Sequence, residues 1–241
     1  MNVDVNSRII VALDVSTLDE AKALIETLAS HVGCFKVGLQ LITSVGTPQV
    51  VEFIHKLGGK VFLDGKFNDI PNTIGEAATA ASKLGVAMFN VHASSGIEAM
   101  IAAVKNKGNS QVLAVTVLTS LEENNINLIF GSPSKAKVLQ FARDAKLAGV
   151  DGIICSPQEI ELLGKQKELE GLSKVVPGVR PSWAAVGDQK RIMTPGDAIA
   201  AGATKLVIGR PITKPPTEIG NSVDAVKRIA EEIAAALERI K

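Results

Sequence analysis

Short apolar runs alternate along the chain with longer stretches whose apolar residues recur at helical spacing. The runs predict strands over residues 9–14, 35–39, 60–66, 88–92, 112–118, 152–155, 174–179 and 205–209. Most of these runs are apolar almost throughout, which is typical of parallel strands that are buried on both faces. The pattern therefore indicates an α/β protein built on a large parallel sheet.

The stretches between the runs predict helices over residues 19–31, 43–57, 70–84, 96–107, 135–148, 157–164, 195–201 and 222–240. Thr17 is suited to cap the first helix, and glycines such as Gly58 and Gly149 are suited to end others. Eight strand–helix units within about 250 residues predict a (β/α)8 TIM barrel. An open, doubly wound sheet is the alternative. No linker or repeat divides the chain, so we expect residues 1–241 to form a single domain.

The composition fits a globular protein with an aliphatic core. Apolar residues make up 46% of the chain but aromatic residues only 3%, which leaves little with which to stack nucleic-acid bases. The formal net charge is +1, and Lys and Arg are scattered along the chain rather than clustered. We therefore expect no nucleic-acid partner, and any site for an anion should be local.

The two cysteines, Cys34 and Cys155, lie in apolar surroundings without metal-ligand spacing, so we expect buried free thiols. The first residues are polar and do not resemble a signal peptide. No apolar run reaches the roughly 18 residues that a membrane span needs. We expect a soluble, cytoplasmic protein that does not interact with a membrane.

Active sites of (β/α)8 barrels lie at the C-terminal ends of the strands, and many residues predicted there are charged. The polar residues at these ends are Asp14, Lys36, Asp64, Lys66, Asp69, His92, Thr119, Ser156, Arg180 and Arg210. The densest group surrounds Lys66, because strand alternation puts Asp64 on the same face and Asp69 follows closely. Such a group is either a structural ion pair or a reactive site, and the second carboxylate favours a reactive site.

Two arginines predict a site for a phosphorylated ligand. Arg210 follows Gly209 at the end of the eighth strand, and Arg180 follows the turn at Gly178 after the seventh. The loops after these strands are the usual phosphate site of the barrel, and a guanidinium binds phosphate through a bidentate fork. The polar connection over residues 182–194 is either a lid over this site or a plain solvated loop.

The sequence gives no reason to expect a metal ion or an organic cofactor. The three histidines are dispersed, and no Gly-x-Gly-x-x-Gly turn is present. Asp64, Asp69 and His92 are a conceivable magnesium site, but Lys66 between the two carboxylates argues against a bound cation. We expect His92 to form a hydrogen bond at the barrel rim rather than to act as a base.

These motifs resemble the orotidine 5′-phosphate decarboxylase family of bacteria. Residues 64–73 read DGKFNDIPNT and match the family's D-x-K-x-x-D-I-P-N-T signature. Supporting matches are VALD at 11–14, FKVG at 35–38, VLTS at 117–120, PGVRP at 177–181, GDQKR at 187–191 and VIGRPI at 207–212. Together they follow the family's order from the first strand to the eighth.

The resemblance implies a cofactor-independent homodimer that converts orotidine 5′-monophosphate to uridine 5′-monophosphate and CO₂ in pyrimidine biosynthesis. Lys66 would give a proton to C6 of the pyrimidine, and Asp64 would lie near the substrate carboxylate. Asp69 and Thr73 would reach into the site of the neighbouring subunit.

The same resemblance implies the residues that bind the rest of the substrate. Asp14 and Lys36 would bind the ribose hydroxyls, with Lys36 also supporting the charged network, and Thr119 would lie near the pyrimidine. The residues that would hold the phosphate and close the lid are Arg180, Gln189, Gly209 and Arg210.

The chain departs from the family pattern at two positions. Gly65 replaces a residue that is commonly apolar, and we expect this to cost packing on the helix-facing side of the strand. Asn68 stands where histidine or another residue is common, and the sequence assigns it no role.

Two other readings fit parts of the pattern. Sugar-phosphate decarboxylases and aldol-type synthases share the Asp-x-Lys-x-x-Asp strand but use Mg²⁺ and lack the Pro-Asn-Thr tail. A barrel that only binds a phosphorylated ligand is the third reading, although mere binding does not need a lysine between carboxylates.

Overall fold

The computed structural model describes residues 5–184 and 193–240. All eight predicted strands form, and they pair in parallel and in chain order to close a barrel. The strands are β1 (Ile9–Ala12), β2 (Cys34–Gly38), β3 (Val61–Phe67), β4 (Met88–His92), β5 (Gln111–Val115), β6 (Gly152–Ile154), β7 (Ser173–Pro177) and β8 (Lys205–Ile208). The barrel closes because β1 pairs with both β2 and β8. The predicted (β/α)8 barrel is confirmed, and the open sheet is wrong.

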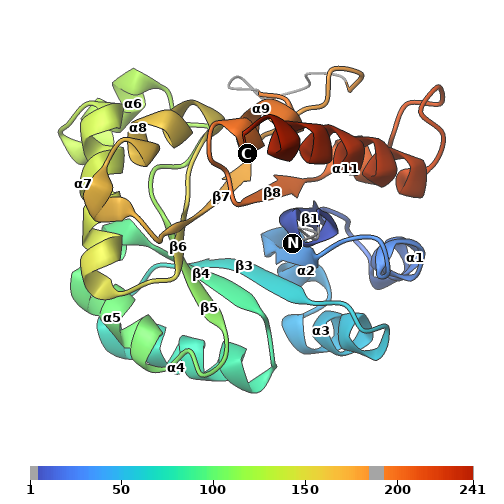
Figure 1. Cartoon of the computed structure of the whole chain (residues 1–241). Helices are drawn as coiled ribbons and strands as arrows, with labels where there is room; N and C mark the ends of the chain where they lie inside the picture. The colour runs from blue at the N-terminus through green and yellow to red at the C-terminus, as the bar shows by residue number, and fades with distance from the viewer. Residues whose placement is uncertain (1–4, 185–192, 241) are drawn as a thin grey trace.

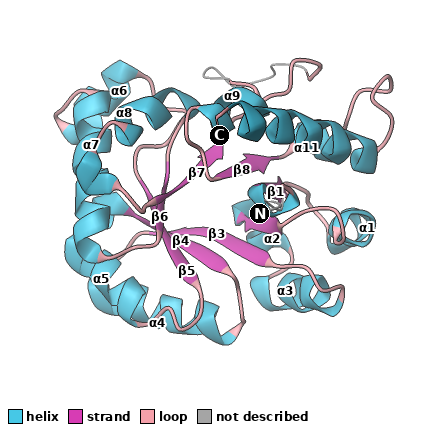
Figure 2. Cartoon of the chain, viewed as in Figure 1, coloured by secondary structure: helices cyan, strands magenta, loops and turns pink. Residues whose placement is uncertain are grey.

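Helices surround the strands on the outside of the barrel (Figures 1 and 2). The helices that follow the strands are α1 (Leu18–Leu28), α3 (Thr47–Lys56), α4 (Pro71–Lys83), α5 (Ile97–Lys105), α7 (Ser134–Ala148), α8 (Ile160–Gly164), α9 (Pro195–Ala200) and α11 (Ser222–Arg239). Shorter additions are α2 (Leu39–Ser44), α6 (Glu123–Phe130), α10 (Arg210–Thr213) and the 3₁₀ turns η1 (Asn6–Arg8), η2 (Ala93–Ser95), η3 (Pro157–Glu159) and η4 (Lys167–Leu169). The predicted cap at Thr17 is confirmed, because its hydroxyl accepts a hydrogen bond from the Glu20 amide.

The sequence pattern misplaced two features of the helical layer. The single helix predicted over residues 43–57 is wrong, because Gly46 has a left-handed φ of 91° and separates α2 from α3. Helix α6 was not predicted, because Ile126 is its one buried residue and no apolar stripe marks it. Several strands also end before their apolar runs do, such as β1 at Ala12 and β5 at Val115.

The inside of the barrel below the mouth is filled by a cluster of mostly apolar side chains. This cluster consists of Ile10, Ala12, Cys34, Phe62, Met88, Leu113, Val175 and Val207. Side chains alternate between the two faces of a strand, so the residues two positions further on also point inward. On β2, β3 and β4 these residues are Lys36, Asp64 and Asn90, all of them buried. The polar group therefore lies directly above the apolar cluster, at the C-terminal end of the barrel.

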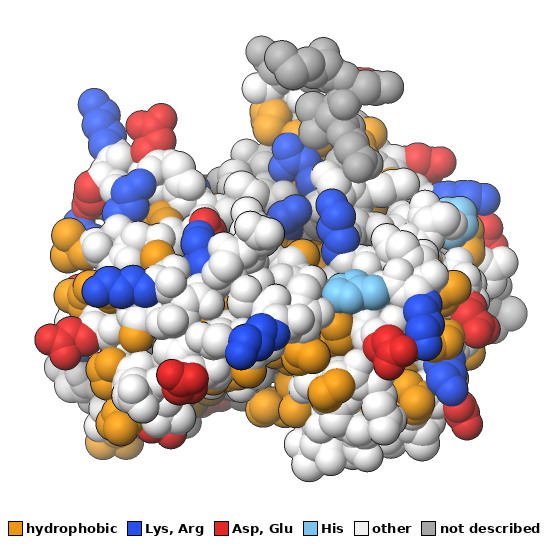
Figure 3. Space-filling view, turned by 90° about the horizontal axis from the view of Figure 1, so that it is seen from below, with side chains coloured by type: hydrophobic (Ala, Val, Ile, Leu, Met, Phe, Trp, Pro, Cys, Tyr) orange, Lys and Arg blue, Asp and Glu red, His pale blue; other side chains and the backbone are white. Residues whose placement is uncertain are grey.

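One face of the molecule does not carry one dominant charge. On the face shown in Figure 3, basic side chains are interspersed with acidic and apolar ones. In the part of the chain that the structure describes, no helix has both the length and the apolarity needed to span a bilayer.

Candidate active site

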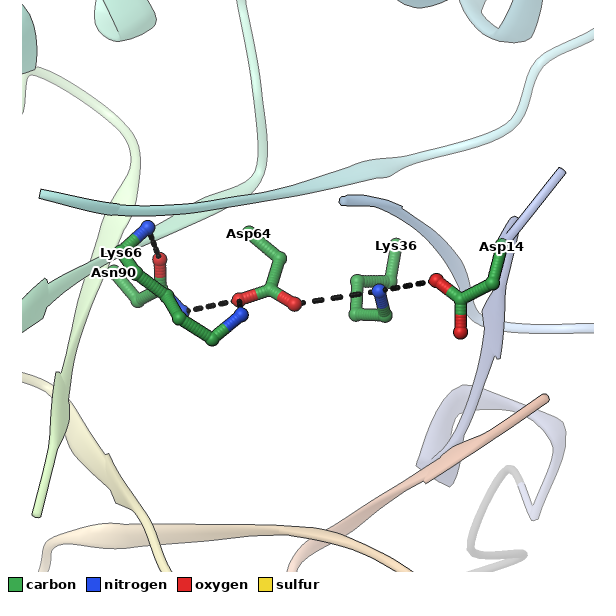
Figure 4. A network of polar contacts seen from close by, with 5 residues as sticks. All are labelled: Asp14, Lys36, Asp64, Lys66 and Asn90. Atoms are coloured by element: carbon green, nitrogen blue, oxygen red, sulfur yellow. Dashed lines mark hydrogen bonds and ion pairs between the residues drawn. The ribbon is translucent and has the colours of Figure 1, made fainter. Parts of the chain in front are cut away.

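Four charged side chains of alternating sign lie in a row across the mouth of the barrel (Figure 4). Lys36 Nζ lies 2.9 Å from Asp14 Oδ1 and 3.3 Å from Asp64 Oδ2. Lys66 Nζ lies 2.7 Å from the other oxygen, Asp64 Oδ1. Each inner charge therefore has opposite charges on both sides, which offsets its loss of hydration. The row also brings together strands β1, β2 and β3.

Lys36 is the most deeply buried ammonium of the row, with 8% of the residue exposed. Burial opposes its charged form, but the attraction of Asp64 and then Asp14 outweighs burial and raises the pKa of the ammonium. Lys36 is thus a fixed cation at neutral pH. Gly38 makes room for it, because a Cβ atom at that position would lie 2.6 Å from Lys36 Nζ. The sequence did not single out Gly38, although a glycine at a strand end signals a close approach.

The backbone geometry that brings Lys66 to Asp64 differs from the regular strand that the sequence predicted. Simple strand alternation is wrong here, because the register of β3 against β4 shifts between Leu63 and Phe67. Within this irregular segment Lys66 has a φ of 49°, and it is the one non-glycine residue with positive φ in the described chain. A bulge therefore directs the lysine side chain back toward Asp64.

Asn90 on β4 completes the network, and the sequence analysis missed it. Its amide donates a hydrogen bond of 2.7 Å to Asp64 Oδ1 and accepts one of 2.7 Å from the Lys66 backbone amide. A buried amide side chain in an otherwise apolar strand was the available signal, since such a group needs partners.

Two adjoining cavities open beside the charged row. One has a volume of about 450 Å³ and is lined by residues that include Asp14, Lys36, Gly178, Arg180, Gly209, Arg210 and Lys214. The other has about 190 Å³ and is lined mostly by apolar residues, with Asp64, Lys66 and Thr119 among them. Lys36, Pro177 and Val207 line both cavities. A ligand with an anionic end and a flat, less polar end would fit across the two.

The larger cavity is suited to an anion. Arg180 is buried, and burial together with the nearby positive charge of Arg210 lowers the pKa of its guanidinium. An arginine stays protonated even so, and two guanidiniums facing one cavity are stabilised by a shared anion. The structure thus brings together Arg180, Gly209 and Arg210 from the predicted phosphate site. Gln189 and most of the predicted lid lie outside the described residues.

Asp69 and Thr73 do not join the row within one chain. Both are exposed, and Asp69 Oδ1 accepts a hydrogen bond of 2.7 Å from the Ile70 amide. Among the described residues Asp69 forms no salt bridge with Lys66. Their predicted contribution to a partner's site stays a prediction, although the neighbouring Ile70 is 66% exposed on the same rim.

The two departures from the family pattern have local explanations. A Cβ atom at Gly65 would lie 2.8 Å from the ring of Phe67, so this glycine makes room for that ring. The packing cost that we expected at Gly65 is therefore offset by Phe67, whose ring lies 5.7 Å from that of Phe89. Asn68 accepts a hydrogen bond of 2.7 Å from the Ser95 hydroxyl, which ties the segment after β3 to η2.

His92 lies beside the row, where burial and then the charge of Lys66 lower its pKa. It is therefore neutral at neutral pH. Among the described residues, no three His, Cys, Asp or Glu side chains converge as metal ligands would. Both oxygens of Asp64 instead face lysine ammonium groups.

Comparison with known proteins agrees with this geometry. A sequence model described as the orotidine 5′-phosphate decarboxylase / HUMPS family matches residues 7–227. The orotidine 5′-phosphate decarboxylase of Heliobacterium modesticaldum is 47% identical, over 98% of this chain and 99% of the relative. That of Geobacter sulfurreducens is 44% identical, over 95% and 96%. The crystal structure of the Lactobacillus acidophilus orotidine 5′-phosphate decarboxylase superposes with a TM-score of 0.79 at 31% identity, over 93% of this chain and 98% of that one.

Proposed function

Because the chain belongs to the orotidine 5′-phosphate decarboxylase / HUMPS family, we propose that it converts orotidine 5′-monophosphate to uridine 5′-monophosphate and CO₂. The observation that carries the proposal is the Lys66 ammonium, paired with Asp64 on the wall of a small apolar cavity. That cavity adjoins a second one with two arginines. A pyrimidine in the first and a phosphate in the second would span the charged row.

The reaction needs a cation at one carbon. When CO₂ leaves C6, the electron pair of the broken bond stays on C6 in the plane of the ring, where no adjacent carbonyl delocalises it. Lys66 supplies positive charge as that electron pair develops and then gives C6 a proton. The product thus gains a hydrogen at C6 where the substrate carried its carboxylate.

Asp64 has two roles in this scheme. It holds the ammonium of Lys66 at 2.7 Å, so that the proton donor is already in place before the carbon–carbon bond breaks. Its negative charge also lies near the substrate carboxylate, which the product lacks, and this repulsion favours the loss of CO₂. Lys36 on the other side keeps the Asp64 carboxylate fixed.

The remaining groups bind parts of the substrate that are distant from the reacting carbon C6. Asp14 and Lys36 bind the ribose hydroxyls, Thr119 lies beside the pyrimidine, and Arg180 and Arg210 bind the phosphate. Gly209 lets the anion approach its backbone, and Gln189, which lies outside the described residues, is proposed as a further phosphate ligand. Binding energy from the phosphate contributes to the rate, because one lysine cannot supply the whole barrier reduction, which is roughly 8–23 kcal/mol for typical enzymes.

The active unit is a homodimer with sites at the interface. Asp69 and Thr73 are exposed at the rim that carries Lys66, and their side chains contribute to the partner's site. The exposed apolar side chains of Leu39, Ile70 and Leu118, which lie near the mouth of the barrel, support a contact there. A cytoplasmic location and independence of any cofactor stay predictions.

The family name also covers HUMPS proteins. The charged row distinguishes the proposed decarboxylase from a magnesium-dependent enzyme and from a barrel that only binds its ligand. A magnesium-dependent reaction needs carboxylate oxygens that face the metal, whereas both oxygens of Asp64 face lysine ammonium groups. A barrel that only binds its ligand gains nothing from burying Lys36 and Asp64, since a buried charge carries a desolvation cost.

Release of CO₂ and formation of uridine 5′-monophosphate from orotidine 5′-monophosphate test the proposal directly. We expect turnover by protein dialysed against EDTA, with no gain on adding Mg²⁺. Lys66→Ala, with an unchanged far-UV circular dichroism spectrum, should be inactive. Turnover of orotidine 5′-monophosphate only with added Mg²⁺ would refute the metal-independent scheme, and binding of the substrate without turnover would indicate a binding protein.

A further inference from the structure

Asn90 occupies an unusual position between two strands. Strands β3 and β4 are in register at Leu63 and Phe89, and again at Phe67 and Val91. Three residues of β3 lie between these pairs, but Asn90 is the one residue between them on β4. The backbone of the bulge therefore lacks regular partners on β4, and the Asn90 side chain is what faces it.

The two hydrogen bonds of Asn90 divide between backbone and side chain. Its Oδ1 accepts from the backbone amide of Lys66, which holds a left-handed conformation that non-glycine residues rarely adopt. Its Nδ2 donates to Asp64 Oδ1, the same oxygen that faces the Lys66 ammonium. Both contacts measure 2.7 Å, and Asn90 itself is fully buried (Figure 4).

We propose that Asn90 is a positioning residue for the decarboxylation. By bonding to both ends of the bulge, it holds the Lys66 backbone in its left-handed turn and fixes the oxygen of Asp64 against which the ammonium rests. It acts through Lys66 and Asp64 and does not touch the reacting atoms. A neutral amide suits this role, because it donates to the carboxylate without adding a charge to the row. The inference rests on the proposed decarboxylase function.

Asn90→Ala removes both hydrogen bonds. We expect kcat to fall by about 100-fold, the loss that a displacement of about 1 Å can cause, while KM changes by less than about threefold because the phosphate contacts are intact. Ser110→Ala is the matched control. It removes a buried hydrogen bond of 2.6 Å to the Val86 carbonyl, before strand β5 and away from the charged row. It should lower the melting temperature and leave kcat unchanged.

Asn90→Asp keeps the shape of the side chain and its acceptor for the Lys66 amide but removes the donor to Asp64. The new carboxylate still accepts from the Lys66 amide but faces Asp64 Oδ1, and two carboxylates at this distance titrate as a pair with a raised pKa. The other titratable groups nearby are Lys66 on β3, Lys36 on β2, Asp14 after β1 and His92 on β4. Protonation of the pair restores the donor. The deficit in kcat relative to the unsubstituted protein should therefore shrink as the pH falls from about 8 to about 6.

A crystal structure of Asn90→Ala gives a readout that does not depend on turnover. We expect residue 66 to lose its left-handed φ, or its ammonium to leave Asp64. An unchanged bulge together with kcat within threefold of the unsubstituted protein would overturn the inference, as would an Asn90→Asp rate that parallels the unsubstituted pH profile. Failure of the unsubstituted protein to turn over orotidine 5′-monophosphate would refute the proposed function instead, and the crystal structure would still test whether Asn90 holds the bulge.

Discussion

Lys36→Met should destabilise the protein more than any loss of its outer partner Asp14. The side chains of Lys36 and Asp64 are 10% and 11% exposed, whereas that of Asp14 is 61% exposed. Removing one partner of a buried ion pair typically costs 3–5 kcal/mol, because the other charge is left buried. We expect a cost of about 3 kcal/mol, at the lower end of that range, because Lys66 and Asn90 still contact Asp64. Asp14→Asn breaks an exposed contact and should cost less than about 1 kcal/mol.

Urea unfolding at one fixed protein concentration tests this difference, because the stability of the proposed dimer would depend on concentration. The free energy of unfolding should fall for Lys36→Met at an unchanged m-value, with a melting temperature roughly 6–12 °C lower. Because the folded pKa of Lys36 is raised, the contribution is fully present below the ordinary lysine pKa and is lost as the pH rises through the raised value. Equal losses for Lys36→Met and Asp14→Asn, or no loss for Lys36→Met, would refute the argument from burial.

Arg210→Ala should lower kcat/KM for the phosphorylated substrate, with a loss of transition-state stabilisation of at least roughly 1.5–3 kcal/mol, the worth of a charge-assisted hydrogen bond. The kcat/KM for the phosphate-free nucleoside should hardly change, and equal losses on both substrates would exclude a phosphate contact. Mixed subunits of inactive Lys66→Ala and Asp69→Ala should regain up to about one quarter of the activity if sites are shared between subunits, since half of randomly exchanged dimers are mixed and each has one intact site. Heterodimers proved by mass spectrometry without activity would refute shared sites. Burial raises the pKa of Cys34 to about 12 and also raises that of Cys155, so both thiols of the native protein should resist a disulfide reagent at pH 8, and rapid labelling would contradict their burial. The free energy of unfolding should fall as the pH rises above about 9, because the thiols ionise more readily in the unfolded chain.

The sequence predicted the barrel well because its signal is repeated eight times. Each buried strand is an apolar run, and the glycines that end helices mark where the chain turns back. Helix α6 escaped prediction because it packs little of its surface and therefore needs no apolar stripe. The break at Gly46 escaped because the apolar residues on either side keep nearly the same spacing.

The charged residues of the candidate site could be predicted, because a charge is conspicuous in an apolar strand. Lys36, Asp64 and Lys66 stood out in apolar strands, and the structure brings them together. Asn90 carries no charge, and its importance comes from a register shift that a single strand's sequence does not reveal. The proposed contribution of Asp69 to a partner's site would depend on a second subunit, and the sequence of one chain suggests it only through family resemblance.

The bulge at Lys66 sets the conformational stability of the backbone against the proposed catalytic role of the lysine. A left-handed φ at a residue with a side chain costs roughly 1–3 kcal/mol, and glycine would relieve that cost. An engineer who searched this protein for stabilising substitutions by backbone geometry alone would rank Lys66→Gly first. The substitution would also remove the ammonium that lies 2.7 Å from the buried Asp64 carboxylate, and with it the proposed proton donor. The bulge therefore combines an unfavourable backbone conformation with the placement of a charged side chain, and glycine would relieve the first only by losing the second.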